Sequence, residues 1–131
     1  YTDLKFVLHF LSQLTETPVI SEKSFKDFLD SKSKNNFIYI MSIDSEPVGM
    51  GTLLIEKKII HNLGSVGHIE DVIIGSEHRG KQFGKKLITF LLETAKNKEC
   101  YKVILDCDEK NKKFYEKCSL YQKGICMAKY F

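Results

Sequence analysis

The segment GHIEDVIIGSEHRGKQFGKKLI, residues 67–88, joins a strand, a loop and a helix in one stretch. Apolar and β-branched residues in IEDVIIG (69–75) predict a central strand. A basic loop with two glycines follows, and the apolar spacing after it predicts an amphipathic helix that begins near Phe83. A strand, a glycine-bearing loop and a helix N-terminus in this order are typical of a phosphate-binding site in an α/β fold.

The loop has the composition that a phosphate site needs. Gly80 and Gly84 allow a tight turn and a close approach to a ligand, and the first helical turn presents free N–H groups at the positive end of the helix dipole. Cations surround the same point: Arg79, Lys81, Lys85 and Lys86. A solvated basic loop before an ordinary helix is the alternative. The motif is not a P-loop, because no Ser or Thr follows Lys85, and the G-x-G-x-x-G spacing is incomplete.

Two adjacent carboxylates, Glu70 and Asp71, interrupt the central strand. Simple alternation puts His68 and Glu70 on one face of the strand and Ile69 and Asp71 on the other. Burial of a carboxylate costs free energy unless it is paired, so an exposed strand end is the alternative for both residues. For Glu70 we favour a function, because a carboxylate beside an apolar cleft has a raised pKa and can accept a proton.

A second polar cluster lies in LDCDEKNKKFYEKC, residues 105–118. Asp106 and Asp108 follow a predicted strand, YKVILDC (101–107), at the sheet edge where open α/β sheets bind ligands. A predicted helix over 111–118 then carries Asn111 and Tyr115 one turn apart on one face. A helix cap at Asn111 and a core position at Tyr115 are the alternatives.

Two helices are predicted before these elements. The first has an apolar stripe and ends at Thr17-Pro18, and Ser21 or Ser24 caps the second. The inward residues of the first are Leu4, Val7, Leu8, Leu11 and Leu14, and those of the second are Phe25, Phe28 and Leu29.

The remaining elements complete one α/β domain. The runs 37–43 and 48–56, joined by the turn residues DSEP, predict an antiparallel hairpin, and a last strand ends in MAKYF (127–131). The expected order is helix, helix, hairpin, strand, helix, strand, helix, strand. A chain of 131 residues has room for one core, so we expect one domain over 1–131.

Composition narrows the class of protein. The net charge of +3 is modest and spread along the chain, which disfavours nucleic-acid binding. Because no apolar run approaches the roughly 20 residues of a membrane span and the first residues do not form a signal peptide, we expect a cytoplasmic protein. The cysteines form no C-x-x-C pair, which favours buried free thiols over disulfides: Cys100, Cys107, Cys118 and Cys126. A metal site using two of them with His61 or His68 is not required by the spacing, so no metal is expected.

Three stretches together resemble the GNAT superfamily of N-acetyltransferases, and within it the branch that acetylates glucosamine 6-phosphate: LLIEKKIIHNLGSVGHIEDV (53–72), HRGKQFGKKLI (78–88) and CYKVILDCDEKNKKFYEKC (100–118). Arg79 and Gly84 fit the superfamily loop [RQ]-x-x-G-x-[GA], but Gln82 occupies the position of its middle glycine. The resemblance implies a mixed, mostly antiparallel sheet flanked by helices, with splayed central strands. In the family a strand precedes the first helix, and we expect the domain over residues 1–131 to start in the helix without that strand.

The resemblance also implies acetyl-CoA as co-substrate. Its pantetheine arm would lie between the splayed strands, bonded to backbone around Asp71, Val72, Ile73 and Ile74. The N–H near Val72 would meet the thioester carbonyl as an oxyanion donor. Asn111 would help to hold the coenzyme, and the loop residues would bind its pyrophosphate: Arg79, Gly80, Lys81, Gln82, Phe83, Gly84 and Lys85.

The implied reaction is direct transfer to the amine of glucosamine 6-phosphate within a ternary complex, a step toward UDP-N-acetylglucosamine. Glu70 would accept the amine proton, Asp71 would orient, and Tyr115 would stabilise or protonate the leaving thiolate. Asp106 would bind the sugar amine or a ring hydroxyl. No acyl-enzyme is expected, because no cysteine has a histidine base placed by the sequence.

The sugar phosphate needs cations. The resemblance implies a homodimer in which the C-terminal segment completes the neighbour's site, with Lys129 nearest the position of the family's basic residue. Lys102 is a second candidate and Lys57 or Lys58 a third, although all of these lysines could simply be solvated. An acceptor pocket with carboxylates but no lysines would favour a peptide amine or a polyamine. A non-catalytic module that binds acyl-CoA is the other alternative.

Overall fold

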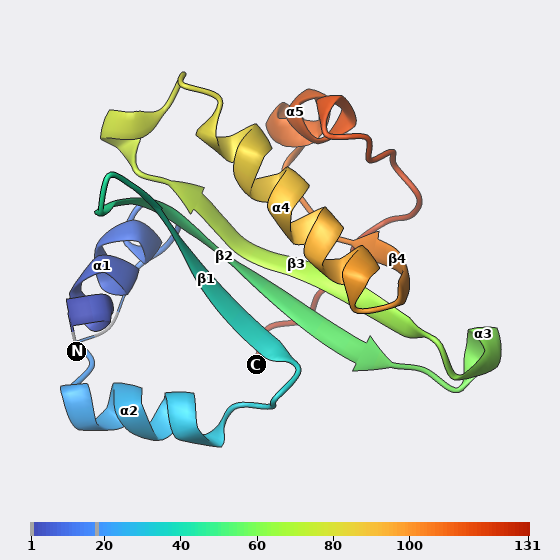
Figure 1. Cartoon of the computed structure of the whole chain (residues 1–131), viewed down its shortest axis with the longest axis horizontal. Helices are drawn as coiled ribbons and strands as arrows, with labels where there is room; N and C mark the ends of the chain where they lie inside the picture. Colours follow the sequence, from blue (N-terminus) through green and yellow to red (C-terminus); the bar gives the residue numbers. More distant parts are fainter. Residues whose placement is uncertain (1, 18) are drawn as a thin grey trace.

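A four-stranded sheet in the order β1-β2-β3-β4 forms the centre of the computed structural model, which describes residues 2–17 and 19–131 (Figure 1). The pairs β1–β2 and β2–β3 are antiparallel, and the pair β3–β4 is parallel. The strands are β1 (Asn36–Ile43), β2 (Glu46–Lys57), β3 (Ser65–Ile74) and β4 (Cys100–Ile104). The helices are α1 (Thr2–Leu11), α2 (Glu22–Ser31), α3 (Ile60–Leu63), α4 (Phe83–Asn97) and α5 (Lys112–Lys117), with 3₁₀ turns η1 (Ser76–His78) and η2 (Glu109–Asn111). The mixed, mostly antiparallel sheet predicted from the sequence is confirmed.

The β1–β2 hairpin follows from its turn. Ile43 pairs with Glu46, and the two residues between them, Asp44 and Ser45, have φ values of 49° and 66°. Positive φ at both central residues is the geometry of a two-residue hairpin turn whose twist matches that of the strands. The predicted hairpin is confirmed, with Asp44 and Ser45 as its turn, whereas Glu46 and Pro47 already belong to β2.

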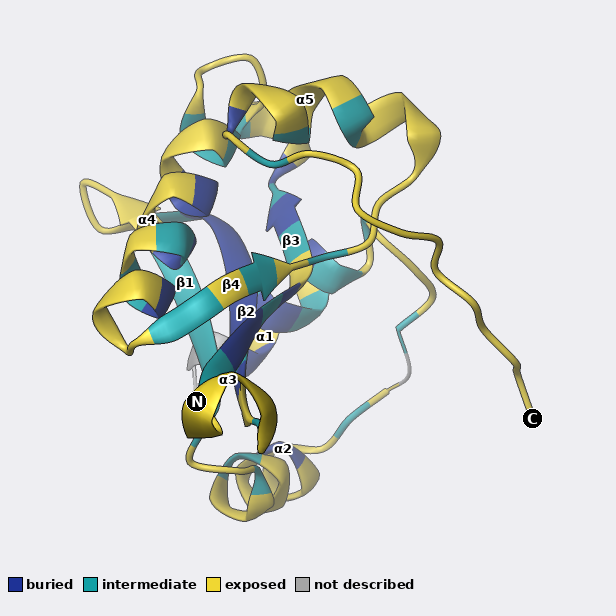
Figure 2. Cartoon of the chain, turned by 90° about the vertical axis from the view of Figure 1, so that its right-hand side faces the viewer, coloured by how far each residue is buried: buried dark blue, intermediate teal, exposed yellow. Residues whose placement is uncertain are grey.

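Helices cover both faces of the sheet (Figure 1). On one face, α4 buries Leu87, Ile88 and Leu91 against Leu53 and Ile69 of the two central strands. On the other face, α1 and α2 pack on the sheet through a second cluster: Leu4, Val7, Phe10, Phe25, Met50 and Ile73. Figure 2 shows these buried positions along the inner faces of the elements.

The two N-terminal helices differ from the prediction in detail. Ser21, not Ser24, is the N-cap of α2, because its Oγ accepts a hydrogen bond from the Ser24 amide (3.1 Å). Phe28 and Leu14 are 46% and 48% exposed, so their predicted burial is wrong. Leu14 lies beyond the end of α1 at Leu11, and α2 reaches the core mainly through Phe25. Pro18, which was expected to end the first helix, lies outside the described residues.

β3 carries one extra residue opposite β2. Thr52 pairs with Glu70 and Met50 pairs with Ile73, so two steps along β2 match three along β3. Asp71 has a φ of 50°, the left-handed conformation found at the first residue of one class of bulge. A β-bulge at Asp71 therefore lies in the middle of the predicted site.

The bulge changes which side chains face the core. Ile69 packs in the cluster under α4, and Val72, rather than Asp71, is the next residue of β3 to join that cluster. Asp71 is exposed instead. The alternation that put Asp71 on the face of Ile69 is therefore wrong, because the inserted residue shifts the period by one.

β3 and β4 separate halfway along β3. Their pairing runs from Ser65 and Cys100 to His68 and Ile104 and ends there, although β3 continues to Ile74. The predicted strand over 101–107 accordingly stops at Ile104. The expected splay of the two strands is confirmed, and it leaves the last residues of β3 without β4 as a partner.

The C-terminal segment, residues 119–131, contains no strand, so the predicted strand ending in MAKYF is wrong for the single chain. Strand residues need a neighbouring strand to satisfy their backbone groups, and this segment pairs with none. Its large apolar side chains are exposed: Tyr121, Ile125, Met127, Tyr130 and Phe131. Figure 2 shows its end leading away from the rest of the chain. Of the helices in the part of the chain that the structure describes, none has the length and apolar character needed to cross a membrane.

Candidate active site

The loop between β3 and α4 has the two left-handed residues that a tight turn requires. Gly80 has a φ of 79° with open space around it, and Gln82, directly before α4, has a φ of 66°. Glycine adopts this conformation without steric cost, whereas a residue with a Cβ is strained by roughly 1–2 kcal/mol. Gln82 thus takes the backbone conformation expected of the missing middle glycine and retains the turn at some cost in stability.

Arg79 is fixed at the end of β3 by two contacts. Its Nε donates a hydrogen bond to the Ile74 carbonyl oxygen (3.1 Å), and its Nη2 donates to Gln13 Oε1 (3.3 Å). Lys81 and Lys85 are exposed on the same loop and the first turn of α4. The cations therefore gather at the N-terminus of α4, where the helix dipole also favours an anion.

Gly84 has a different role from Gly80. A Cβ built on Gly84 would lie 3.1 Å from Cζ of Phe114, which belongs to α5. The missing side chain at Gly84 therefore lets α5 pack close to the start of α4. Gly84 was predicted to allow the close approach of a ligand. In the structure it allows the close approach of the Phe114 ring.

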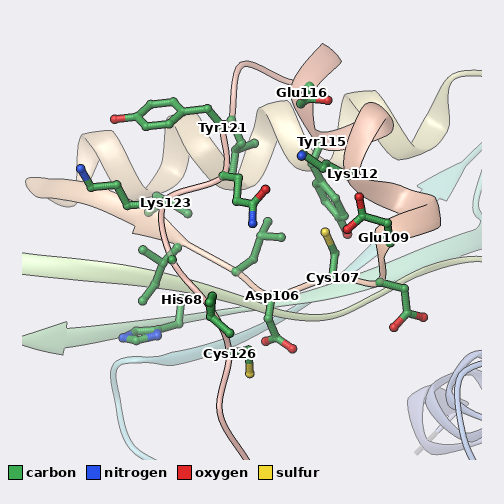
Figure 3. Close-up of a pocket in the computed structure, with 18 of the residues that line it drawn as sticks. His68, Asp106, Cys107, Glu109, Lys112, Tyr115, Glu116, Tyr121, Lys123 and Cys126 are labelled. Atoms are coloured by element: carbon green, nitrogen blue, oxygen red, sulfur yellow. The ribbon is translucent and has the colours of Figure 1, made fainter.

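A cavity of about 510 Å³ opens where β3 and β4 part (Figure 3). Its walls come from β3, from the end of β4 and the residues after it, from α5, and from the C-terminal segment. The cavity brings together Glu70, Asp106 and Tyr115, three of the predicted site residues. The other predicted residues do not line it: Asp71, Val72, Ile73, Ile74, Arg79, Gly80, Lys81, Gln82, Phe83, Gly84, Lys85, Lys102, Asn111 and Lys129.

Glu70 is electrostatically suited to accept a proton. Partial desolvation is the largest cause that raises the pKa of its carboxyl above the ordinary 4.5, and the negative charges of Asp106 and Asp71 raise it further. His68 acts in the opposite direction. A carboxylate with a raised pKa is a stronger base, so Glu70 has the property on which its predicted role depends.

Tyr115 is suited to donate a hydrogen bond from a protonated hydroxyl. Burial is the main cause that raises the pKa of its phenol above 10, and nearby Cys107, Cys118 and Asp106 raise it further. The hydroxyl therefore stays protonated near neutral pH. Figure 3 shows Tyr115 in the cavity wall beside Cys107 and Lys112.

Asn111 immediately precedes α5, but its side chain makes no capping hydrogen bond and is exposed. The alternative in which Asn111 serves only as a helix cap is therefore not supported by its side-chain contacts. The exposed side chain is therefore accessible to a ligand.

Among the cavity-wall residues that were not predicted as site residues, three carry a basic side chain: His68, Lys112 and Lys123. His68 lines the cavity, and its Nε2 lies 3.0 Å from Glu56 Oε1. This hydrogen bond is the largest cause that lowers the pKa of Glu56. Lys112 and Lys123 also line the cavity and bring positive charge to a wall otherwise rich in carboxylates. Alternation had put His68 on the face of Glu70, but nothing local to the sequence indicated the two lysines.

The cysteines are less buried than expected. All are free thiols, but Cys118 alone is buried, whereas Cys107 and Cys126 are exposed in irregular segments and line the cavity. Partial desolvation and the adjacent acidic residues raise the pKa of the Cys107 thiol, which lowers its reactivity. Within residues 2–17 and 19–131, no three His, Cys, Asp or Glu side chains cluster in a way that could hold a metal ion.

Comparison with known proteins gives the family. Residues 7–120 match the family model described as the acetyltransferase (GNAT) family. The chain is 44% identical to glucosamine 6-phosphate N-acetyltransferase of Arabidopsis thaliana over 97% of its own length and 89% of that protein, and 39% identical to glucosamine 6-phosphate N-acetyltransferase 1 of Dictyostelium discoideum over 92% and 79%. The chain therefore belongs to the GNAT family of acetyltransferases.

The fold agrees with this assignment. The crystal structure of glucosamine-6-phosphate N-acetyltransferase from Arabidopsis thaliana superimposes with a TM-score of 0.91 at 40% identity, covering 98% of this chain and 91% of that one. GNAT enzymes use acetyl-CoA as co-substrate. The splay of β3 and β4, the open turn at Gly80 and the cations at the start of α4 fit an elongated thioester with a pyrophosphate.

Proposed function

We propose that this chain transfers the acetyl group of acetyl-CoA to the amine of glucosamine 6-phosphate, giving CoA and N-acetylglucosamine 6-phosphate. The observation that carries the proposal is the composition of the cavity wall at the splay of β3 and β4. Carboxylates of Glu70 and Asp106 suit a sugar amine, and the ammonium groups of Lys112 and Lys123 suit a phosphate. The names of the relatives from Arabidopsis and Dictyostelium support the same acceptor.

The lysines separate this proposal from its nearest alternative. A pocket with carboxylates alone would favour a polyamine or peptide amine, but this cavity combines carboxylates with Lys112 and Lys123. A non-catalytic acyl-CoA module would have no need for a proton acceptor such as Glu70 in the wall. The mixed charge therefore favours an acceptor that itself carries both an amine and an anion.

The coenzyme would lie along the free edge of β3. The Gly75 amide donates to the Val48 carbonyl of β2 (2.8 Å), and alternate backbone groups of a strand point to opposite edges. The amides of Ile74 and Val72 would thus face the gap beside β4, with Asp71 and Ile73 completing this part of the binding edge. Acetyl-CoA would supply the acetyl group as a thioester, whose carbonyl oxygen the Val72 amide is suited to stabilise.

The loop after η1 would hold the pyrophosphate. Arg79 and the lysines at 81 and 85 supply charge, and amides from Gly80 to Gly84, including those of Gln82 and Phe83, lie at the positive end of the α4 dipole. Asn111 would contact the coenzyme from the start of α5. A Gly-rich nest with a single arginine would bind chiefly through backbone donors and point charges.

The acceptor chemistry would be shared between the cavity carboxylates and Tyr115. Glu70 would take the proton that the attacking amine loses, directly or through a water, and Asp71 would orient the reacting groups. Asp106 would bind the amine or a ring hydroxyl. Tyr115 would stabilise the departing thiolate by a hydrogen bond from its hydroxyl, or protonate it. Direct transfer needs no covalent intermediate with the protein, so no cysteine has a role in it.

The phosphate of the sugar would be bound by lysine. Lys112 and Lys123 are the candidates within the cavity wall, while Lys102 lies over the Tyr101 ring (5.8 Å) and Lys129 over the Phe131 ring (5.5 Å). Lys129 was predicted to act in a partner's site, so its role stays a prediction. We infer a homodimer in which the exposed apolar C-terminal segment pairs with the neighbouring chain, because an extended segment with these side chains is unstable in water.

We also infer a reducing compartment such as the cytoplasm. The exposed thiols of Cys107 and Cys126 support this inference, since such groups are kept reduced there. A role in the synthesis of UDP-N-acetylglucosamine follows from the proposed product.

A thiol-release assay with acetyl-CoA tests the function. The acceptors are glucosamine 6-phosphate, glucosamine, spermidine and a lysine peptide at equal concentration. Glucosamine 6-phosphate should give the highest kcat/KM. Glucosamine lacks the phosphate contact, so its KM should be higher while its kcat changes little. Preference for spermidine or the peptide would contradict the proposed acceptor. A protein that binds CoA but acetylates none of the four acceptors would favour the non-catalytic module.

A further inference from the structure

A polar contact links the end of α1 to the loop that carries Arg79. Gln13 follows α1, and its Oε1 accepts hydrogen bonds from the Ser76 amide (2.9 Å) and from Nη2 of Arg79 (3.3 Å). The same guanidinium donates through Nε to the Ile74 carbonyl (3.1 Å). These contacts use two of the donors of Arg79 and define the plane of the guanidinium, so its remaining N–H groups are presented in a set direction.

Gln13 is itself held in place by the core. The backbone amide of Gln13 donates a hydrogen bond to the Phe10 carbonyl oxygen (3.0 Å), and Phe10 is 1% exposed. Gly75 has no side chain, and a Cβ there would lie 3.2 Å from Cε1 of Phe10. Phe10, in the last turn of α1, therefore packs closely against the end of β3. The backbone of Gln13, whose side chain is the acceptor for Arg79, is hydrogen-bonded to this core residue.

Restraint of Arg79 matters because the residue is exposed and has a long, flexible side chain. An exposed arginine loses much rotamer freedom when it binds an anion, and this loss weakens binding. A side chain oriented before the ligand arrives has already lost part of that freedom. The contact from Gln13 supplies this orientation from the turn after α1, a helix that lies on the other side of the sheet from α4.

We propose that Gln13 is a positioning residue for coenzyme binding, and that it acts on the pyrophosphate through Arg79. This inference rests on the proposed function in one respect, the assignment of the loop after η1 to CoA. A purely structural role for Gln13, tying α1 to the Ser76 amide, is the competing explanation. The two differ in whether the effect of Gln13 depends on Arg79.

A double-mutant cycle measures that dependence. CoA affinity is determined by isothermal titration calorimetry for the wild type, Gln13→Met, Arg79→Met and the double variant. Methionine keeps the length of glutamine and removes the acceptor. We expect Gln13→Met to weaken CoA binding by about 5- to 20-fold. This is less than the roughly 10- to 150-fold of a direct hydrogen bond to a charged group, because Gln13 acts on the ligand only through Arg79. The same change should add less than about twofold when Arg79 is already replaced.

A truncated donor separates the pyrophosphate from the thioester. S-acetylpantetheine has no pyrophosphate, so Gln13→Met should change its kcat/KM by less than about twofold while that of acetyl-CoA falls. Ser12→Ala is the matched control, because the Ser12 hydroxyl bonds the His9 carbonyl (2.6 Å) in the same turn. It should bind CoA as the wild type does.

Gln13→Asn covers the case in which Gln13→Met does not fold. It keeps the amide but is one methylene too short to reach Arg79, and we expect the same loss of CoA affinity. Three outcomes would each overturn the inference: additive effects in the cycle, equal losses of kcat/KM for acetylpantetheine and acetyl-CoA, or unchanged CoA affinity in Gln13→Asn. Wild-type protein that binds CoA without acetylating glucosamine 6-phosphate contradicts only the proposed acceptor, and the cycle still decides the role of Gln13. Wild-type protein that does not bind CoA contradicts both.

Discussion

The loop at residues 79–85 and the wall of the cavity between β3 and β4 are assembled in different ways. The loop is one continuous stretch whose turn, charge and helix start follow from neighbouring residues. The cavity wall joins β3, the end of β4, α5 and a C-terminal segment that has no secondary structure beyond α5. A site built from local sequence can be predicted from it, whereas a site built from separate segments depends on how those segments pack.

The largest expected effect falls on the cavity side of this comparison. Glu70→Gln removes the proton acceptor with little change in shape, so kcat should fall by about 10²–10⁴-fold while CoA affinity stays unchanged. Steady-state kinetics and CoA titration of the same preparation measure both quantities. Retention of more than a tenth of wild-type kcat would remove Glu70 from the role of base.

The lysines give the next largest effect and test which part of the wall binds phosphate. Lys123→Ala should raise KM for glucosamine 6-phosphate by about tenfold and leave KM for acetyl-CoA unchanged, because one charge-assisted contact is lost. Lys129→Ala should do the same if the partner's C-terminal segment completes the site. Lys26→Ala, on the exposed surface of α2, is a neutral control. Equal changes in both KM values would contradict the assignment of either lysine.

The pH dependence tests the charges around Glu70. Because the pKa of its carboxyl is raised, kcat/KM should fall as the pH drops through a value above 4.5. Asp106→Asn removes one negative charge that raises this pKa, so the acidic limb should move to lower pH. The sign for stability is the opposite of that for activity: a raised carboxyl pKa stabilises the fold at low pH, and this contribution is lost as the pH rises through the folded value. NMR titration of Glu70 in both proteins gives the shift directly, and an unmoved or raised midpoint in Asp106→Asn would contradict it.

The smallest expected effect falls on the loop. Gln82→Gly relieves a left-handed conformation at a non-glycine residue, which should increase the free energy of unfolding by about 0.5–1 kcal/mol. Urea denaturation measures it, with Lys81→Gly, at a neighbouring loop position without positive φ, as the control. A loss of stability in Gln82→Gly equal to that of the control would show that Gln82 is not strained.

The sequence predicted the parts of the site that depend on neighbouring residues. The turn at Asp44 and Ser45 and the start of α4 at Phe83 follow from turn chemistry and apolar spacing. Glu70 was singled out because a carboxylate in an apolar strand is costly to bury. Asp106 was singled out at the end of a strand, where open sheets bind ligands, and Tyr115 on one face of the helix that follows. The fold brings the three residues to one cavity. Where residues are close in the sequence, the forces that position them act over the same short range.

Tertiary structure alone decided the rest. The bulge at Asp71 arises from the pairing of β3 with β2, and the gap opens because β3 outlasts its pairing with β4 at His68. The predicted last strand does not form in the single chain, because a strand is stable only when another strand satisfies its backbone groups. Lys112 and Lys123 reach the cavity through the packing of α5 and the C-terminal segment. Such features depend on pairings between distant segments, and they cannot be predicted from the residues of any one segment.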